Sequence, residues 1–67
     1  MIKLTQVVRG GEERSVYLRA DDIRAVHEAA NGGAIVFWCN GVRENDYIVT
    51  EKADEVSRAV EEELRCK

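Results

Sequence analysis

The sequence predicts a small α+β domain, with four or five strands in a bent antiparallel sheet or an SH3-like or Sm-like barrel, and one C-terminal helix. Short runs of alternating apolar and polar side chains, typical of strands, occupy most of residues 2–50. Glycines at 10–11, 32–33 and 41 separate these runs, as turns do. Residues 51–64 instead repeat apolar side chains every three or four positions, as an amphipathic helix does. The chain has 67 residues and no linker composition, so residues 1–67 form a single predicted domain.

The first two runs, residues 2–9 and 14–19, are expected to form a hairpin. In each run the apolar side chains recur at every second position, which places them on one face of a strand, although Gln6 interrupts the row. Gly10-Gly11 lies between the runs and supplies the turn.

Residues 21–30 fit two structures. As a helix, the segment has Asp21 or Asp22 at its N-cap and stops at Asn31-Gly32. As a strand, it alternates from Ile23 onward and turns at the same glycines into the next run. The local pattern slightly favours the helix.

Residues 34–39 are apolar on both faces of a strand. One face carries Ile35, Phe37 and Cys39, and the other carries Ala34, Val36 and Trp38. A chain of this length buries only roughly 60% of the surface that its unfolded form exposes, so its core is marginal. We therefore expect a homo-oligomer, a dimer or tetramer, that covers the face of Ala34, Val36 and Trp38, because one short helix does not cover it fully.

The last two elements follow an Asn40-Gly41 turn. The sequence predicts that residues 42–45 lengthen this turn and that residues 46–50 form a strand. The helix over residues 51–64 takes Thr50 as its N-cap. We expect it to pack through an apolar stripe made of Ala53, Val56, Val60 and Leu64.

Composition excludes several classes of function. The net charge of −3 argues against binding duplex nucleic acid. No signal peptide or membrane span is present, which predicts a cytoplasmic protein with no membrane partner and with Cys39 and Cys66 reduced. The single histidine and two cysteines lack metal-ligand spacing, and there is no phosphate-binding glycine loop or catalytic motif. We expect a non-enzymatic protein without a cofactor or metal.

The candidate site residues suit a nucleotide. Aromatic rings stack on bases, guanidinium groups bind phosphate through paired hydrogen bonds, and an amide reads a base edge. The residues with these properties at predicted strands, strand ends and turns are Trp38, Tyr17, Tyr47, Arg19, Arg24, Arg43 and Asn40. Each also has an ordinary structural explanation: a core or interface position for the rings, surface ion pairs for the arginines and a turn position for Asn40.

The chain resembles the small flagellar FlbD (SwrD) family over nearly its whole length. The residues that carry the resemblance are Met1-Ile2-Lys3-Leu4-Thr5, Leu18-x-Ala20-Asp21-x-Ile23, Asn40-Gly41, and Tyr47-x-Val49-x-Glu51 leading into Asp54-Glu55-Val56. The resemblance implies a β-rich chain with a C-terminal helix, and it makes residues 23–29 a strand. It also implies a flagellar or motility accessory protein as one function.

Two departures from this family point to a ligand. Phe37, Trp38 and Cys39 stand where a more polar strand is expected, and residues 43–45 extend the turn. By analogy of size and residue types, the chain is similar to phage proteins that sequester the cyclic-nucleotide signals of antiphage defence (anti-CBASS and anti-Thoeris proteins). The main hypothesis is therefore an oligomeric immune-evasion sponge for a cyclic nucleotide, acting in the host cytoplasm if phage-encoded. A motility accessory protein and a module that binds a host protein are the alternatives.

Overall fold

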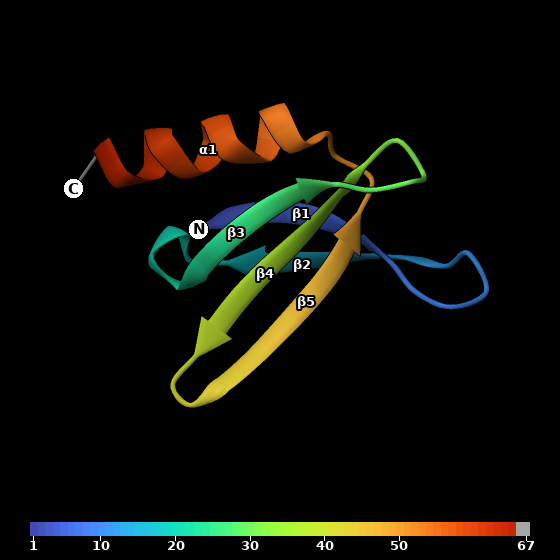
Figure 1. Ribbon diagram of the computed structural model, residues 1–67, viewed down its shortest axis with the longest axis horizontal. Helices are drawn as coiled ribbons and strands as arrows, with labels where there is room; N and C mark the ends of the chain where they lie inside the picture. Colours follow the sequence, from blue (N-terminus) through green and yellow to red (C-terminus); the bar gives the residue numbers. More distant parts are fainter. Residues whose placement is uncertain (66–67) are drawn as a thin grey trace.

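The computed structural model, which describes residues 1–65, contains a five-stranded antiparallel sheet with one helix across one of its faces (Figure 1). The elements are β1 (Ile2–Val7), β2 (Glu13–Leu18), the short 3₁₀ helix η1 (Ala20–Asp22), β3 (Ile23–Glu28), β4 (Ala34–Asn40), β5 (Arg43–Val49) and α1 (Ala53–Arg65). This arrangement confirms the predicted α+β class, its antiparallel sheet and its C-terminal helix. The prediction for the thiol of Cys66 falls outside the described residues.

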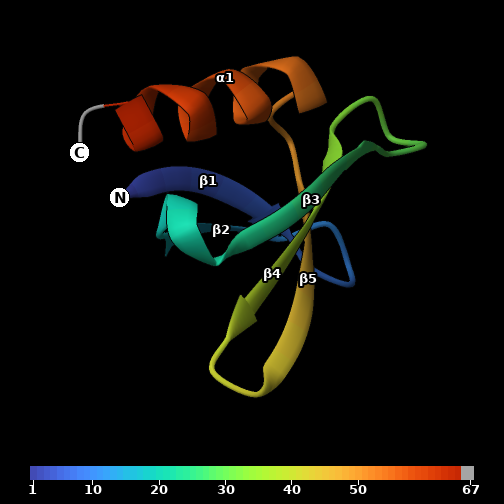
Figure 2. The same cartoon turned by 60° about the vertical axis from the view of Figure 1, so that its left-hand side comes forward.

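The sheet is open and strongly bent. Its strand order is β2-β1-β5-β4-β3, so β2 and β3 form the two edges. Within residues 1–65, the register between β1 and β5 consists of the pair Gln6–Val49, whereas the hairpins β1–β2 and β4–β5 pair along their length. The β1–β2 hairpin therefore turns away from the other three strands and crosses behind them (Figures 1 and 2). Of the two predicted forms, the structure has the bent open sheet and not a closed barrel.

The segment 21–30 contains strand β3, so the helix that the local pattern favours does not form. The reason is not local. β3 pairs antiparallel with β4, and the register places Val26 opposite Val36, where both pack in the core. A tight loop makes this pairing possible, since the Ala29 N–H donates to the carbonyl oxygen of Gly33 at 3.1 Å. The strand implied by the family resemblance is confirmed.

The β4–β5 hairpin has a two-residue loop, Gly41-Val42, because Asn40 pairs directly with Arg43. Gly41 has a φ of 70°, the left-handed value that the first central residue of a type II′ turn requires. The prediction of a longer loop that includes residues 43–45 is wrong. Strand β5 starts three residues earlier than predicted because the tight turn keeps both strands in register from the first pair onward.

Helix α1 begins at Ala53, two residues later than predicted, so Thr50 is not its N-cap. Thr50 and Glu51 instead fasten the chain to β1. The Thr50 N–H donates to the carbonyl oxygen of Thr5 at 3.0 Å, and the Thr5 N–H donates to Glu51 Oε1 at 2.8 Å. Both backbone groups of Thr5 are thereby satisfied where the sheet ends and the helix has not yet begun.

The core lies between α1, the β1–β2 hairpin and the side of β3–β5 that meets them, which we call the inner face. Its buried side chains are Ile2, Leu4, Leu18, Ala20, Ala34, Val36, Val49 and Val56. Val56 is 1% exposed, and Ala53 and Val60 pack against the same cluster, as the apolar stripe of the helix predicts. Leu64 is 46% exposed, so its predicted docking is wrong. The last turn of α1 extends past the start of β1, where no strand lies beneath it (Figure 1).

Strand β4 is apolar on both sides, and the fold decides which side is covered. Ala34 and Val36 point to the inner face and are 0% exposed. The prediction that Ala34 and Val36 stay open for self-association is therefore wrong, whereas Trp38 on the same side is half-buried. On the opposite side, the outer face, Phe37 and Ile48 remain 39% and 44% exposed. The helix crosses the inner face only, so the uncovered apolar surface lies on the outer one (Figure 2).

Candidate functional site

A hollow of about 400 Å³ lies along the β4–β5 hairpin and gathers four of the predicted site residues. It is lined by Trp38, Asn40, Arg43, Glu44, Asn45, Asp46 and Tyr47. The register pairs Trp38 with Asn45 and Asn40 with Arg43, which brings these side chains together although they come from two strands. Alternation along the strands places Trp38 and Tyr47 on the inner side, beyond the part that α1 covers.

The two rings in this hollow touch each other. The centroids of Trp38 and Tyr47 are 5.3 Å apart and their planes meet at 46°, a tilted aromatic pair. Both rings are half-buried and pack against the core, so core packing explains part of their position. It leaves one polar atom unexplained: among the described residues, the buried indole Nε1 of Trp38 has no hydrogen-bond partner. An unpaired buried donor costs about 1–3 kcal/mol.

The polar side chains that β5 contributes to the hollow point alternately to its inner and outer sides. Arg43 and Asn45 share the side of β5 that carries Tyr47, whereas Glu44 and Asp46 alternate to the outer side and still line the hollow. Arg43 is exposed and, within residues 1–65, forms no ion pair. The hollow therefore offers one unpaired guanidinium, two amide side chains, two carboxylates and an aromatic surface.

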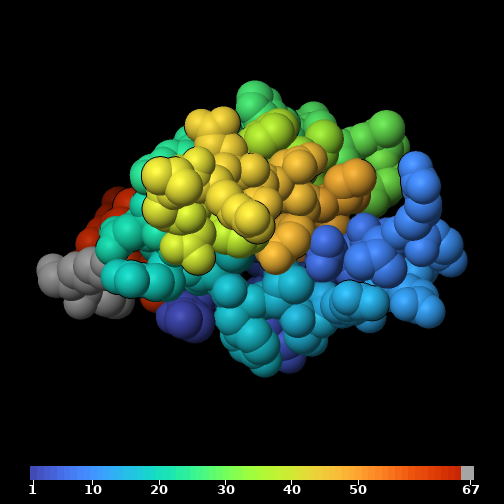
Figure 3. All heavy atoms as spheres, turned by 90° about the horizontal axis from the view of Figure 1, so that it is seen from below, coloured from blue at the N-terminus to red at the C-terminus, as the bar shows by residue number. Residues whose placement is uncertain are grey.

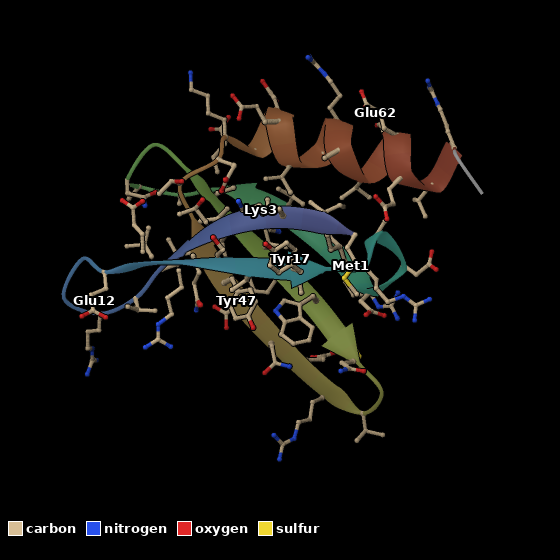
Figure 4. All side chains as sticks on the ribbon, turned by 180° about the vertical axis from the view of Figure 1, so that it is seen from behind. Met1, Lys3, Glu12, Tyr17, Tyr47 and Glu62 are labelled. Carbon is tan, nitrogen blue, oxygen red and sulfur yellow. The ribbon has the colours of Figure 1, made fainter. Side chains whose placement is uncertain are left out.

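The other predicted residues lie elsewhere. Tyr17 is on the edge strand β2 and is 59% exposed, and in Figure 4 it lies on the hairpin in front of the strand that carries Tyr47. Arg19 and Arg24 gather around Asp21 in η1: Arg19 Nη2 is 3.8 Å from Asp21 Oδ2, and Arg24 Nη1 donates to the carbonyl oxygen of Asp21 at 3.1 Å. These two arginines act as surface ion-pair and loop residues, the ordinary explanation considered for them above.

A second hollow, of about 610 Å³, lies on the outer face and was not predicted. It is lined by Val7, Val8, Arg9, Ala29, Ala30, Asn31, Ile35 and Ile48. The loops β1–β2 and β3–β4 stand at the same end of the molecule and border this hollow (Figure 3). The sequence does carry one signal for it. Ile48 is an apolar residue between Tyr47 and Val49, so it must point away from the core that receives its neighbours.

No family model, curated protein or solved structure matches the chain. The likeness to the flagellar FlbD (SwrD) family therefore stays a prediction. Within residues 1–65, no helix is both long and apolar enough to cross a bilayer. The same residues contain no cluster of three or more His, Cys, Asp or Glu side chains placed to hold a metal ion.

Proposed function

We propose that this protein is a non-enzymatic binding protein that holds a nucleotide in the β4–β5 hollow. The observation that carries the proposal is the meeting of Trp38, Tyr47, Asn40 and Arg43 in one hollow built from two adjacent strands. Its volume of about 400 Å³ lies within the range of small-molecule sites, about 300–1,000 Å³.

The rings supply the affinity for a base. Stacking of a base on an aromatic side chain contributes about 1–3 kcal/mol and is tolerant of which base is present. The unpaired Nε1 of Trp38 supports a ligand role, because it is a buried donor for which the described residues offer no acceptor. Asn40 and Asn45 lie beside the ring and offer amide groups to a base edge.

The single guanidinium limits the ligand. Arg43 binds one phosphate through paired, charge-assisted hydrogen bonds. A ligand with two phosphates, such as a cyclic dinucleotide, is therefore expected to engage the hollows of two chains, and calorimetry measures this stoichiometry directly. A cyclic-nucleotide signal of antiphage defence fits the proposal as the ligand class, and the protein would then act by sequestering it.

Titration of the wild-type protein with cyclic di- and trinucleotides and cyclic ADP-ribose isomers tests the proposal. Trp38 is the only tryptophan of the chain, so its fluorescence reports on the hollow alone. We expect submicromolar binding of at least one compound, with a change in tryptophan emission. The bound compound is expected to be recovered intact after the protein is denatured, as chromatography of the released ligand will show.

Arg43→Gln is expected to weaken this binding at least about tenfold, because it removes the charged partner of the phosphate. Arg58→Gln is the matched control, since it removes the same charge from the exposed side of α1, away from the hollow. Equal losses in both variants would indicate a non-specific effect of charge. If no compound in the panel binds, the nucleotide proposal is wrong, and the motility and host-protein hypotheses take precedence.

A further inference from the structure

The outer face has an apolar centre that the described chain leaves uncovered. The side chains that form it are Val7, Val8, Ile35, Phe37 and Ile48. His27 extends it, since its ring packs edge-on against Phe37 with centroids 5.5 Å apart and planes at 84°. Two of the largest exposed apolar side chains of the molecule, Phe37 and Ile48, lie diagonally to each other on adjacent strands, since Ile48 pairs with Ile35. An apolar surface of this kind on a small protein marks an interaction site.

Opposite charges stand at opposite ends of this centre. Arg9 lines the hollow at the end formed by the loops β1–β2 and β3–β4. Asp46 and Glu44 lie two and four residues before Ile48 on the same side of β5, with Asp46 directly opposite Phe37 and Glu44 closer to the tip of the hairpin. Among the described residues, none of these three charged side chains forms an ion pair within the chain. Each is therefore free to pair with another molecule.

We propose that a second copy of this chain covers the outer face, related by a twofold axis perpendicular to it. A twofold axis brings the same patch of both subunits together and reverses its direction. The apolar centres then meet, and Arg9 of one protomer faces the partner's Asp46 and Glu44, twice in each dimer. A second copy of the chain thus accounts for both the exposed apolar side chains and the opposite charges on either side of them.

The size of the face suits such a dimer. The molecule measures 37 × 26 × 18 Å, and Figure 1 looks down the shortest axis onto the broad side that β3–β5 form. A stable interface buries about 800 Å² of each partner, about one sixth of the 4901 Å² that the chain exposes. The dimer also adds the apolar burial that a 67-residue core lacks. It leaves Trp38, Arg43 and Tyr47 of the β4–β5 hollow open, because strand alternation places these side chains on the inner side.

Analytical ultracentrifugation over micromolar to near-millimolar concentrations tests the proposal. The wild-type protein is expected to show a reversible monomer–dimer equilibrium based on the 7.6 kDa chain. Phe37→Glu is expected to raise the dissociation constant about 30-fold or more, the effect of removing a central interface side chain. Val42→Glu is the matched control, because Val42 is 100% exposed at the hairpin tip, outside the interface. Circular dichroism of each variant shows whether it is folded.

A charge exchange tests the orientation. Arg9→Glu and Asp46→Arg each place like charges together in their own homodimer, so each is expected to dissociate at least about tenfold more readily than wild type. In a mixture of the two variants, every contact between positions 9 and 46 again joins opposite charges, and dimers are expected to return. Arg9 and Asp46 form no ion pair within the described chain, so folding of the monomer does not depend on them. Both variants are therefore expected to keep the wild-type circular dichroism spectrum.

Three results overturn the proposal: a wild-type monomer at near-millimolar concentration, a dimer that Phe37→Glu does not weaken, or a mixture of the charge variants that does not associate. The first result assigns the outer face to a different protein. The first two results involve no residue that lines the β4–β5 hollow, so they overturn the dimer without bearing on nucleotide binding, and the two proposals fail separately.

Discussion

Val56→Asn is expected to unfold a large part of the population at room temperature. Val56 is 1% exposed and is the side chain through which α1 meets the core. The change loses the burial of a valine and places an amide among Ala34, Val36 and Val49, whose side chains offer it no partner. The expected loss is about 3 kcal/mol or more, compared with a total stability of about 3–10 kcal/mol for a chain of this size. Urea denaturation followed by circular dichroism measures it.

Leu64→Asn is the control for this prediction. It makes the same replacement on the same helix at a side chain that is 46% exposed. We expect it to cost less than about 1 kcal/mol, which corresponds to a shift in melting temperature below about 8 °C for a domain of this length. Equal destabilisation by both changes would mean that the last turn of α1 docks as the sequence predicts and that the exposed position of Leu64 is wrong.

Gly33→Ala is expected to have the second largest effect on stability. A methyl group at this position would overlap the carbonyl oxygen of Val49 and lie 3.1 Å from its carbonyl carbon. Because those atoms belong to the backbone of β5, they cannot move aside as a flexible side chain does. The β3–β4 loop and the end of β5 must separate, which is expected to cost about 1–3 kcal/mol and to lower the melting temperature by more than about 5 °C.

Gly10→Ala separates this steric effect from the general cost of replacing a glycine. Gly10 has a φ of 95°, so alanine is strained there, but no atom lies within 4 Å of the added methyl group. We expect a cost of about 1 kcal/mol from the backbone conformation alone. A Gly33→Ala variant as stable as Gly10→Ala would show that the loop and β5 are not in close contact.

The candidate site was predicted in part. Trp38 and Tyr47 were each chosen from the sequence for their rings, yet their contact at 5.3 Å depends on the register of β4 against β5. Arg43 was expected in a loop and instead begins a strand, which directs its side chain along the same side as Tyr47. The sequence alone makes Arg19 and Arg24 as suitable for binding phosphate as Arg43. Their position around Asp21 follows from the 3₁₀ turn before β3, which residue type alone does not reveal.

The sequence by itself determined the features that depend on neighbouring residues. Alternation in residues 34–39 predicted a strand with two apolar sides, and the spacing of Ala53, Val56 and Val60 predicted a helix with one buried stripe. Glycines predicted the positions of the turns, because their backbone freedom is a local property.

Only the tertiary structure decided the features that depend on distant partners. Residues 23–28 became a strand because β4 pairs with them, although their own pattern slightly favours a helix. The helix covered the side of Ala34 and Val36 and left Phe37 and Ile48 exposed. Both sides of β4 are apolar, so hydrophobicity alone does not choose between them. The choice follows from the bend between β1 and β5, which brings the β1–β2 hairpin and α1 to the same side of the sheet.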